Sequence, residues 1–578
     1  MANRIVYEDY AVGAAENAVI DLQNTDQQLK RDGQQYTDPY HVDKILEDDV
    51  NEHASFDGNG IDLTKPFRVF GNSNLSYPEG FVSADVSGSD CTFTTPQKIT
   101  ITFGNAVISG NGISVFYNTN YCKTVRVTYT HSNESTSVFT YYNNLEKEVF
   151  LPARVDLYKK IEIEFLDTEV PNQRAKVRRI TFGREVIIDK MKSISFNKKM
   201  DYYGADIPIN SLDVTFYNEE ELNMSGNQKI RLYHNDDLIG TYWIADVEKV
   251  TDKLYSVSAD DAFCILDNVQ ADPIWVRTGT SKSFSEITSA IHSSVSITGH
   301  INGSAGGMLH KVSGRRLLAE SIFAFKVYAK TTADGNVLVF YPITSDAFNI
   351  GEDKIIGTSK FSTVKAPTSV LWTYTKYGSP MYGEYIEGQL RLRGIAIDSA
   401  GATVTEQYPI YTLFAYDSSN EPVPSQSYSL TSSVPPLSVT MTPTGSTLSN
   451  INVYMVYYNR DEVSVKKERE NVGTNERVDE KDFGQKGLYN ILDLLWADDV
   501  KNRVFGVIGE VRAKIILNHV VTENNALVTK YLDVGDYVSI DTKYSGKLYG
   551  TITEINANVG YEDIVGDVVI TVWQTNQH

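Results

Sequence analysis

At 578 residues the chain is too long for one ordinary domain, and on the order of three to five domains are expected. Its 53 Lys and Arg residues against 74 Asp and Glu residues give a formal net charge of −21, which argues against a general nucleic-acid-binding surface. The three cysteines, Cys91, Cys122 and Cys264, are too few for a disulfide framework, and no stretch has the pattern of a signal peptide or a membrane span.

Residues 1–60 are the least strand-like part of the chain. Apolar residues are sparse and irregular there, and short polar helices are the expectation for residues 16–30 and 42–52. We interpret the segment as an N-terminal arm that packs on a neighbouring protein, with plain disorder as the alternative.

Residues 61–185 change to many short strands, such as KITITF, TVRVTYTH and KKIEIEF, separated by Gly, Asn and Asp turns. This spacing predicts a β-sandwich. Sandwiches can bind sugars by stacking them on exposed aromatic rings, and the candidates for such stacking are Tyr117, Tyr121, Tyr129, Tyr141 and Tyr142. Exposed tyrosines also suit subunit interfaces, so a structural role is favoured over glycan binding.

Residues 186–270 alternate between apolar and polar side chains over several runs, with turn signals at residues 203–206 and 224–227. A period of two indicates antiparallel strands with one buried face, and the spacing suits a small meander closed into a barrel.

Residues 271–364 mix helix and strand signals. Ser283 followed by Glu286 predicts a capped helix over residues 284–295, and a second apolar stripe follows Ser313. A strand comes after the turn at residues 334–335, so we expect a small α/β domain.

Residues 365–578 return to strands, with an additional β-rich subdomain at about 395–460. The Ser-, Thr- and Pro-rich run at 418–450 keeps enough alternation to predict edge strands rather than a linker. A helix is expected over residues 488–504, with an apolar stripe assigned to the core: Leu488, Ile491, Leu492, Leu495 and Trp496. The closing runs VGDYVSIDT, GTITEINANV and VVITVW predict a second barrel.

The sequence contains no G-x-S-x-G, HExxH, P-loop or CxxC motif. Neighbouring carboxylates such as Asp260 and Asp261 point to opposite faces of a strand and make poor acid–base pairs. We therefore expect no enzyme and assign no catalytic, cofactor-binding or metal-binding residue. A β-rich glycosidase that brings distant carboxylates together is the alternative.

Several phrases resemble one class of protein. GADIPINSLDVTFYN, GTYWIADVEKV and SVSADDAFCILDN resemble the first barrel of the tail-hub (baseplate hub or tail-associated) proteins of long-tailed bacteriophages. The stretch from TFTTPQKITITF to VRRITFG resembles the carbohydrate-binding-module-like jelly roll that some hubs carry, and YLDVGDYVSIDT with VVITVW resembles the closing barrel. The phrases occur in hub order from about residue 61 onward. The implied fold is mainly β and multidomain: a sandwich and two tail-tube-like barrels separated by a small α/β domain.

The resemblance implies a homotrimer, in which two barrels per chain give six similar modules that fit the sixfold end of a tail tube. Its implied partners are the tail tube, distal tail proteins, the tape measure protein and fibre or tip proteins. Phage DNA would pass through a central channel without sequence-specific binding. The implied location is the distal end of the virion tail, and the implied place of synthesis is the host cytoplasm. Many hubs carry a C-terminal lytic domain, and the sequence leads us to expect none here. The alternatives are an adhesin that binds cell-surface glycan through the 61–185 sandwich, and the hub of a phage-derived contractile injection device.

Overall fold

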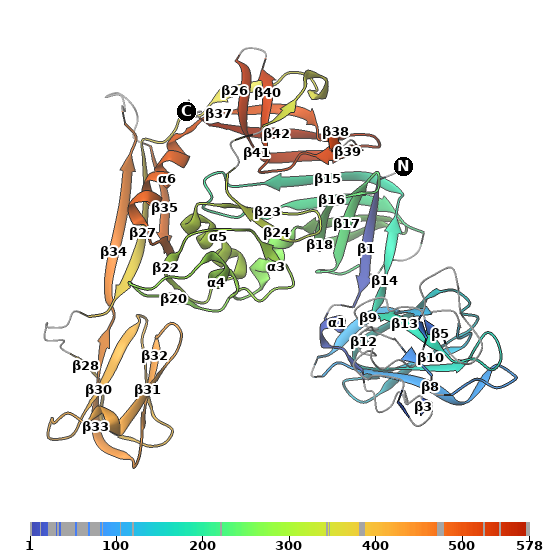
Figure 1. Ribbon diagram of the computed structural model, residues 1–578, viewed down its shortest axis with the longest axis horizontal. Coiled ribbons are helices and arrows are strands. Elements are labelled where there is room, and N and C mark those ends of the chain that lie inside the picture. The colour runs from blue at the N-terminus through green and yellow to red at the C-terminus, as the bar shows by residue number, and fades with distance from the viewer. Residues whose placement is uncertain are drawn as a thin grey trace.

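A computed structural model describes residues 3–573 except 12, 21–29, 32–33, 36–52, 55–67, 70–80, 84, 105, 118–120, 220–221, 223, 343–344, 346, 381–387, 471–478, 524–525 and 543–544. The fold is mainly β and multidomain, as predicted from the alternation. Figure 1 shows an arch: a broad body carries two lobes that hang from its opposite ends. Most of the two helices expected in residues 16–30 and 42–52 lies outside the described residues.

The body is built on a 13-stranded sheet that contains strands from both ends of the chain. Its first half has the order β14-β1-β17-β18-β19-β16-β15, and its second half continues as β41-β42-β37-β26, with β40 beside β41 and β25 beside β40. The first-half strands are Gly183–Ile188 (β14), Arg4–Tyr10 (β1), Lys229–His234 (β17), Asp237–Thr251 (β18), Leu254–Asp260 (β19), Ser211–Tyr217 (β16) and Met191–Lys199 (β15). The second-half strands are Gly546–Val559 (β41), Ile564–Trp573 (β42), Val507–Ile516 (β37), Lys360–Thr363 (β26), Tyr537–Thr542 (β40) and Phe348–Ile350 (β25).

Both halves enclose a single hydrophobic core, in which Phe216 and Leu232 of the first half belong to the same cluster as Ile555 and Ile570 of the second. The sequence predicted two barrels separated by an α/β domain. The described pairings instead form one open path of strands through both halves. Alternation along a strand determines which side chains are buried, but it does not determine which strand pairs with it. The pairing of the two halves into one sheet could therefore not be predicted from the sequence.

Strand β1 differs from the expectation of an arm. Arg4–Tyr10 pairs antiparallel with both β14 and β17, and its side chains Ile5 and Tyr7 are fully buried. The run Ile5-Val6-Tyr7 is short but apolar, and it lets β1 occupy the position between β14 and β17 in the sheet.

One lobe is an 8-stranded sheet with its own core, which contains Phe103, Tyr158 and Phe165. Its strands are Thr136–Tyr141 (β11), Val125–His131 (β10), Glu148–Asp167 (β12), Ile108–Tyr117 (β9), Lys176–Thr181 (β13), Phe81–Val82 (β7), Thr92–Thr102 (β8) and Val19–Ile20 (β2). The chain leaves this lobe at Gly183 and enters the body directly through β14.

The centre of the body holds the helices Ala262–Asn268 (α3), Phe284–Thr288 (α4) and Gly314–Phe325 (α5). They pack with two small sheets made of Ile274–Val276 (β20), Ala305–Leu309 (β22) and Leu488–Asn490 (β36), and of Ile297–Thr298 (β21), Val337–Phe340 (β24) and Tyr328–Thr331 (β23). Ser283 and Glu286 form the predicted capping box of α4. This helix ends at Thr288 rather than near residue 295, because the amides of Ala290 and Ile291 bond three residues back and tighten the last turn.

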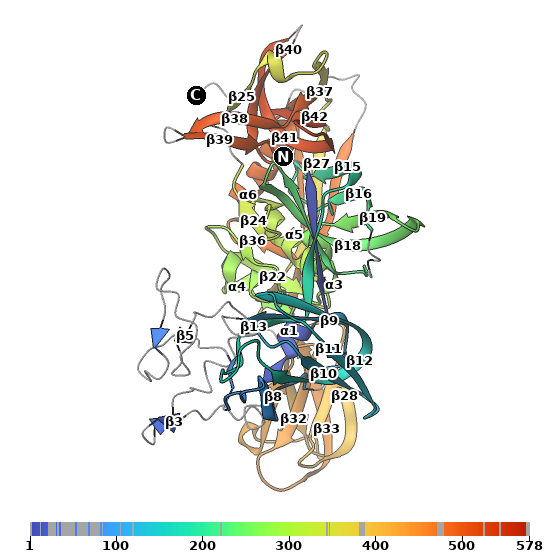
Figure 2. The ribbon, with the colours of Figure 1, turned by 90° about the vertical axis from the view of Figure 1, so that its right-hand side faces the viewer.

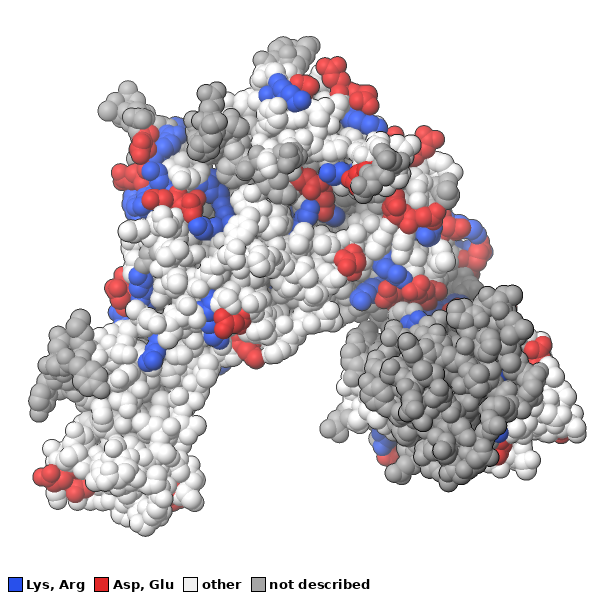
Figure 3. All heavy atoms as spheres, in the orientation of Figure 1, with Lys and Arg blue, Asp and Glu red and all other residues white. Residues whose placement is uncertain are grey.

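The second lobe is carried at the tip of a long hairpin. Ser369–Gly378 (β27) pairs along its full length with Asn459–Glu468 (β34), and Glu480–Lys486 (β35) lies on its other side. The lobe has two three-stranded sheets around its own core: Gln389–Ile397 (β28), Leu448–Tyr457 (β33) and Ile410–Tyr416 (β30), and Ala402–Thr405 (β29), Ser438–Pro443 (β32) and Tyr428–Ser432 (β31). Figure 3 shows few charged side chains on the face of this lobe that is in view.

The helix Asp493–Phe505 (α6) corrects one expectation. Leu488 lies before it in β36. Trp496 is fully buried, as predicted, and it packs against Trp372. However, Ile491, Leu492 and Leu495 are 44%, 60% and 63% exposed and do not belong to the core. The buried face of α6 is instead formed by Trp496, Ala497, Val500 and Val504.

Candidate functional site: two equivalent half-sheets and the joint between them

The two half-sheets repeat one five-strand pattern. In the order of the chain, strands one to five are β15 to β19 in the first half and β26, β37, β40, β41 and β42 in the second. In both halves the spatial order is three-four-five-two-one, and every pair in it is antiparallel. An order that departs from the chain order in the same way twice makes the halves topologically equivalent.

The equivalence extends to single residues. Starting from the first residue of the third strand, the paired residues across the first half are Lys229, Trp243, Asp260, Ser211 and Asn197. The corresponding row across the second half is Tyr537, Thr551, Thr571, Glu510 and Ser362. Each row defines which positions match, so that Asn197 of β15 corresponds to Ser362 of β26.

A matching irregularity supports this alignment. The register between strands four and five shifts between Ile244 and Asp246 in the first half, and between Ile552 and Glu554 in the second. Both shifts begin one residue beyond the row, so the extra residue of each β-bulge falls at the same place. Bulges fix register and bend a strand locally, so an equivalent bulge indicates an equivalent strand shape.

The two halves meet at one strand pair. Strand β15 pairs antiparallel with the distal part of β41, from Ser195 opposite Asn558 to Lys199 opposite Glu554. The side-chain amide of Asn197 donates to the side-chain oxygen of Asn556 across this joint. Phe196 and Ile555, which belong to the two joined strands, are buried in the shared core. Strand one of the first half thus occupies the free edge of strand four of the second.

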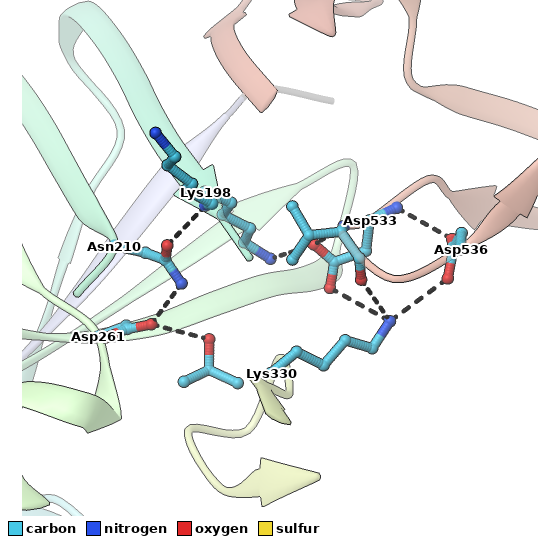
Figure 4. A network of polar contacts seen from close by, with 9 residues as sticks. Lys198, Asn210, Asp261, Lys330, Asp533 and Asp536 are labelled. Carbon is cyan, nitrogen blue, oxygen red and sulfur yellow. Dashed lines mark hydrogen bonds and ion pairs between the residues drawn. The ribbon is translucent and has the colours of Figure 1, made fainter. Parts of the chain in front are cut away.

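A polar network joins the two halves to the α/β part beneath the joint (Figure 4). Lys198 of β15 donates to Asp533, which precedes β40, at 3.0 Å. Lys330 of β23 donates to Asp536 at 3.3 Å and to the carbonyl of Val534 at 3.0 Å, and its Nζ lies 3.8 Å from Asp533. Burial alone raises the pKa of Asp533, but the two ammonium groups outweigh it and hold this pKa below its ordinary value.

The same network continues through Asp261, which caps α3 from a position that is 1% exposed. Its carboxylate accepts hydrogen bonds from the side chains of Asn210 at 2.6 Å and Thr331 at 3.1 Å, and from the amide of Phe263 at 3.2 Å. Burial raises the pKa of Asp261 to about 7, although these hydrogen bonds oppose the rise.

Beside the joint lies a largely apolar pocket of about 370 Å³. Met200 and Tyr202 after β15, Tyr328 and Phe340 of the α/β part, and Trp573 of β42 line it. Arg503 of α6 closes one side: its guanidinium donates to the carbonyls of Tyr203 and Lys326 and lies 4.7 Å over the ring of Tyr328. The pocket therefore marks a seam where four segments meet.

The five candidate glycan-stacking tyrosines do not form one platform. Tyr117 and Tyr129 are 0% and 1% exposed in the core of the 8-stranded lobe, so their rings cannot receive a sugar. Tyr121 and Tyr141 pack against that core, and the hydroxyl of Tyr141 donates to the carbonyl of Pro152 at 2.7 Å. Tyr142, 69% exposed, is the one member of the set with an open ring face.

Within the described part of the chain, no group of three or more His, Cys, Asp or Glu side chains is arranged to hold a metal ion. The three cysteines are free thiols, and burial raises the pKa of the Cys122 and Cys264 thiols. No helix among these residues is long and apolar enough to cross a membrane.

The joint residues were missed by sequence reasoning, although one signal was present. The run Ile244-Ala245-Asp246-Val247 and the run Ile552-Thr553-Glu554-Ile555 share the pattern Ile, any residue, an acid, then a β-branched residue. These runs lie at the two equivalent bulges. Ile508-Gly509-Glu510-Val511 of β37 has the same pattern, so the pattern alone does not align the halves.

No known protein-family model matches the chain, and no curated protein is similar to it in sequence. Among solved structures, it is similar to the 43 kDa tail protein of prophage MuSo2 from Shewanella oneidensis, with 9% identity, 67% of this chain and 95% of that chain covered and a TM-score of 0.39. A tail protein from Neisseria meningitidis is 9% identical, with 68% and 95% covered and a TM-score of 0.38. A prophage tail protein from Listeria monocytogenes is 9% identical, with 68% and 93% covered and a TM-score of 0.36.

Proposed function

We propose that the chain is a structural protein of a bacteriophage tail, a hub that caps the distal end of the tail tube, connects it to tip or fibre proteins and surrounds the DNA exit channel. The observation that carries the proposal is the residue-level equivalence of the two half-sheets. A chain with two equivalent modules side by side gives six modules in a trimer, which lets a threefold assembly fit a sixfold tube. The resemblance of the sequence phrases to tail hubs supports the same assignment.

The arrangement of the lobes supports this role as well. Both lobes project from the same side of the body, at opposite ends of the arch, and leave the opposite side of the body uncovered by them (Figures 1 and 3). In a ring of three chains the sheets would form the wall, while six lobes would face one side and be available to distal proteins.

The test is the mass and symmetry of the purified full-length chain. Sedimentation should give a trimer, and electron-microscopy averages should show a ring with six similar wall segments around an opening. In virions that carry the chain, antibody labelling should fall at the tail tip. A chain that stays monomeric, shows no rotational symmetry and labels elsewhere on the particle would overturn the proposal. Turnover of peptidoglycan or polysaccharide would do so in favour of an enzyme.

A further inference from the structure

The joint inside one chain predicts the contact between chains. Strand four of the second half, β41, has a distal edge at residues 554–558, and this edge is covered by strand one of the first half. By the row alignment, the equivalent edge on strand four of the first half is residues 246–250 of β18. The pairing of β17 with β18 stops at Trp243, and among the described strands none other than β19 pairs with β18 beyond that point.

The matching strand is also available. Strand β26 is strand one of the second half, the equivalent of β15, and it is the last strand on its side of the sheet. It pairs with β37, and no other described strand pairs with its outer edge. By the same alignment, Lys360–Thr363 corresponds to residues 195–198, which are four of the five residues of β15 that pair with β41. Phe361 falls at the position of Phe196.

Apolar side chains at the β15–β41 joint are more buried than the side chains at the equivalent positions of β26 and β18. Phe196 and Ile555 are 6% and 0% exposed at the joint. Their equivalents, Phe361 and Val247, are each only partly buried. Figure 2 shows the β18–β19 hairpin projecting from the body, so a strand of another molecule can reach it. Open strand edges are templates for pairing with another chain.

We propose that β26 of one copy pairs antiparallel with residues 246–250 of β18 in the next copy, in the register of the β15–β41 joint. This rests on the proposed function and names the surfaces that would build its ring. Transferred from Asn197 opposite Asn556, the register sets Ser362 opposite Glu248 of the next copy. Lys360, two residues away, then lies diagonal to Glu248, a favourable cross-strand charge pair. The contact is head-to-tail, so it generates a ring if the rotation closes.

The test is a disulfide between copies of the full-length chain. Ser362→Cys with Glu248→Cys in one chain should form intermolecular disulfides under mild oxidation, with a ladder on non-reducing gels that stops at three chains. Asn197→Cys with Asn556→Cys, at the joint itself, is the positive control and should close within one chain. Thr363→Cys with Glu248→Cys places the thiols on opposite faces and should not link. The wild-type chain with its native cysteines is the blank.

Mixing the two single variants should link Ser362→Cys chains to Glu248→Cys chains and should stop at dimers. If the joint control closes, the wild-type chain is a trimer and Ser362→Cys with Glu248→Cys does not link, the pairing is wrong and the hub proposal stands. If the wild-type chain is also monomeric, both fail. A ladder that continues past three chains supports the pairing and overturns the closed threefold ring.

Discussion

Replacing Asp533 by Ala tests whether the polar network holds the two half-sheets together. Asp533 receives the ammonium group of Lys198, whose side chain is 10% exposed, and it lies near that of Lys330, which is 16% exposed. Breaking a buried ion pair from one side costs about 3–5 kcal/mol, because a charge is left without compensation. Lys330 keeps Asp536 and the Val534 carbonyl. Lys198 loses the one carboxylate paired with it among the described residues, so we expect a loss of about 3 kcal/mol.

The assay is urea unfolding followed by tryptophan fluorescence. The five tryptophans, Trp243, Trp275, Trp372, Trp496 and Trp573, all lie in the body, and neither lobe contains one. The signal therefore reports the body without a contribution from lobe unfolding. The matched control is Glu219→Ala, because Glu219 pairs with Lys190 and Lys253 through side chains that are all more than 60% exposed. Exposed pairs of this kind contribute about 0–1 kcal/mol.

A double variant tests whether the loss in Asp533→Ala comes from the uncompensated charge of Lys198. In Asp533→Ala with Lys198→Met, the lysine that Asp533→Ala leaves without a carboxylate is removed as well, and an apolar chain of similar length fills its space, while Lys330 keeps Asp536. We expect this variant to regain at least half of the stability lost by Asp533→Ala alone, since apolar replacement of a whole buried pair is often neutral. A loss from Asp533→Ala no larger than that from Glu219→Ala, or a double variant with the summed losses, would refute the reasoning.

Three further predictions follow from burial. The folded chain keeps a proton on Asp261 up to about pH 7, whereas the unfolded chain releases it near pH 4, so this group makes the free energy of unfolding fall as pH rises between those values. Asp261→Asn should therefore remove a slope of up to about 1.4 kcal/mol per pH unit from the free energy of unfolding, measured in urea across that pH window. Trp496→Ala should cost about 3–5 kcal/mol by the same fluorescence assay, whereas Leu494→Ala, at a position 79% exposed, should change stability by less than about 0.5 kcal/mol. If the full chain binds glycan, Tyr142→Ala should weaken that binding while circular dichroism shows the lobe still folded, whereas Tyr129→Ala should unfold the lobe. Unchanged glycan binding in Tyr142→Ala would exclude stacking on this ring as the mechanism.

Local chemistry in the sequence was enough for several elements. The alternation of apolar and polar residues marked the strands of the first half-sheet and β40, β41 and β42 of the second, because a period of two is a property of each strand alone, but it did not mark β26. The capping box of Ser283 and Glu286 was readable for the same reason: its hydrogen bonds join residues three positions apart. The placement of Tyr129 among the exposed candidates was wrong, although it follows Val125 and Val127 at intervals of two, which puts its side chain on their inward face.

The joint could not be predicted in the same way. Asn197 and Asn556 are 359 positions apart, and nothing in either strand specifies the other as its partner. The exposed leucines of α6 were mispredicted for a related reason. Helical periodicity placed Leu495 on an apolar stripe, but it does not say whether another element covers that stripe. Partner choice and coverage are properties of the whole fold, so single-segment patterns leave them open.

The insertions in the chain fall where equivalent half-sheets can accept them. Strands one and two are joined by residues 200–210 in the first half, and by residues 364–506 in the second, a stretch that includes the second lobe and α6. This connection leaves the sheet at the same point of the pattern in both halves, so its length does not change the rows or the bulges. Long insertions in connecting segments cost little closure entropy. The repeated five-strand unit can therefore keep the shape that a ring demands, while the connection between its first two strands carries whatever the ring must present to its neighbours.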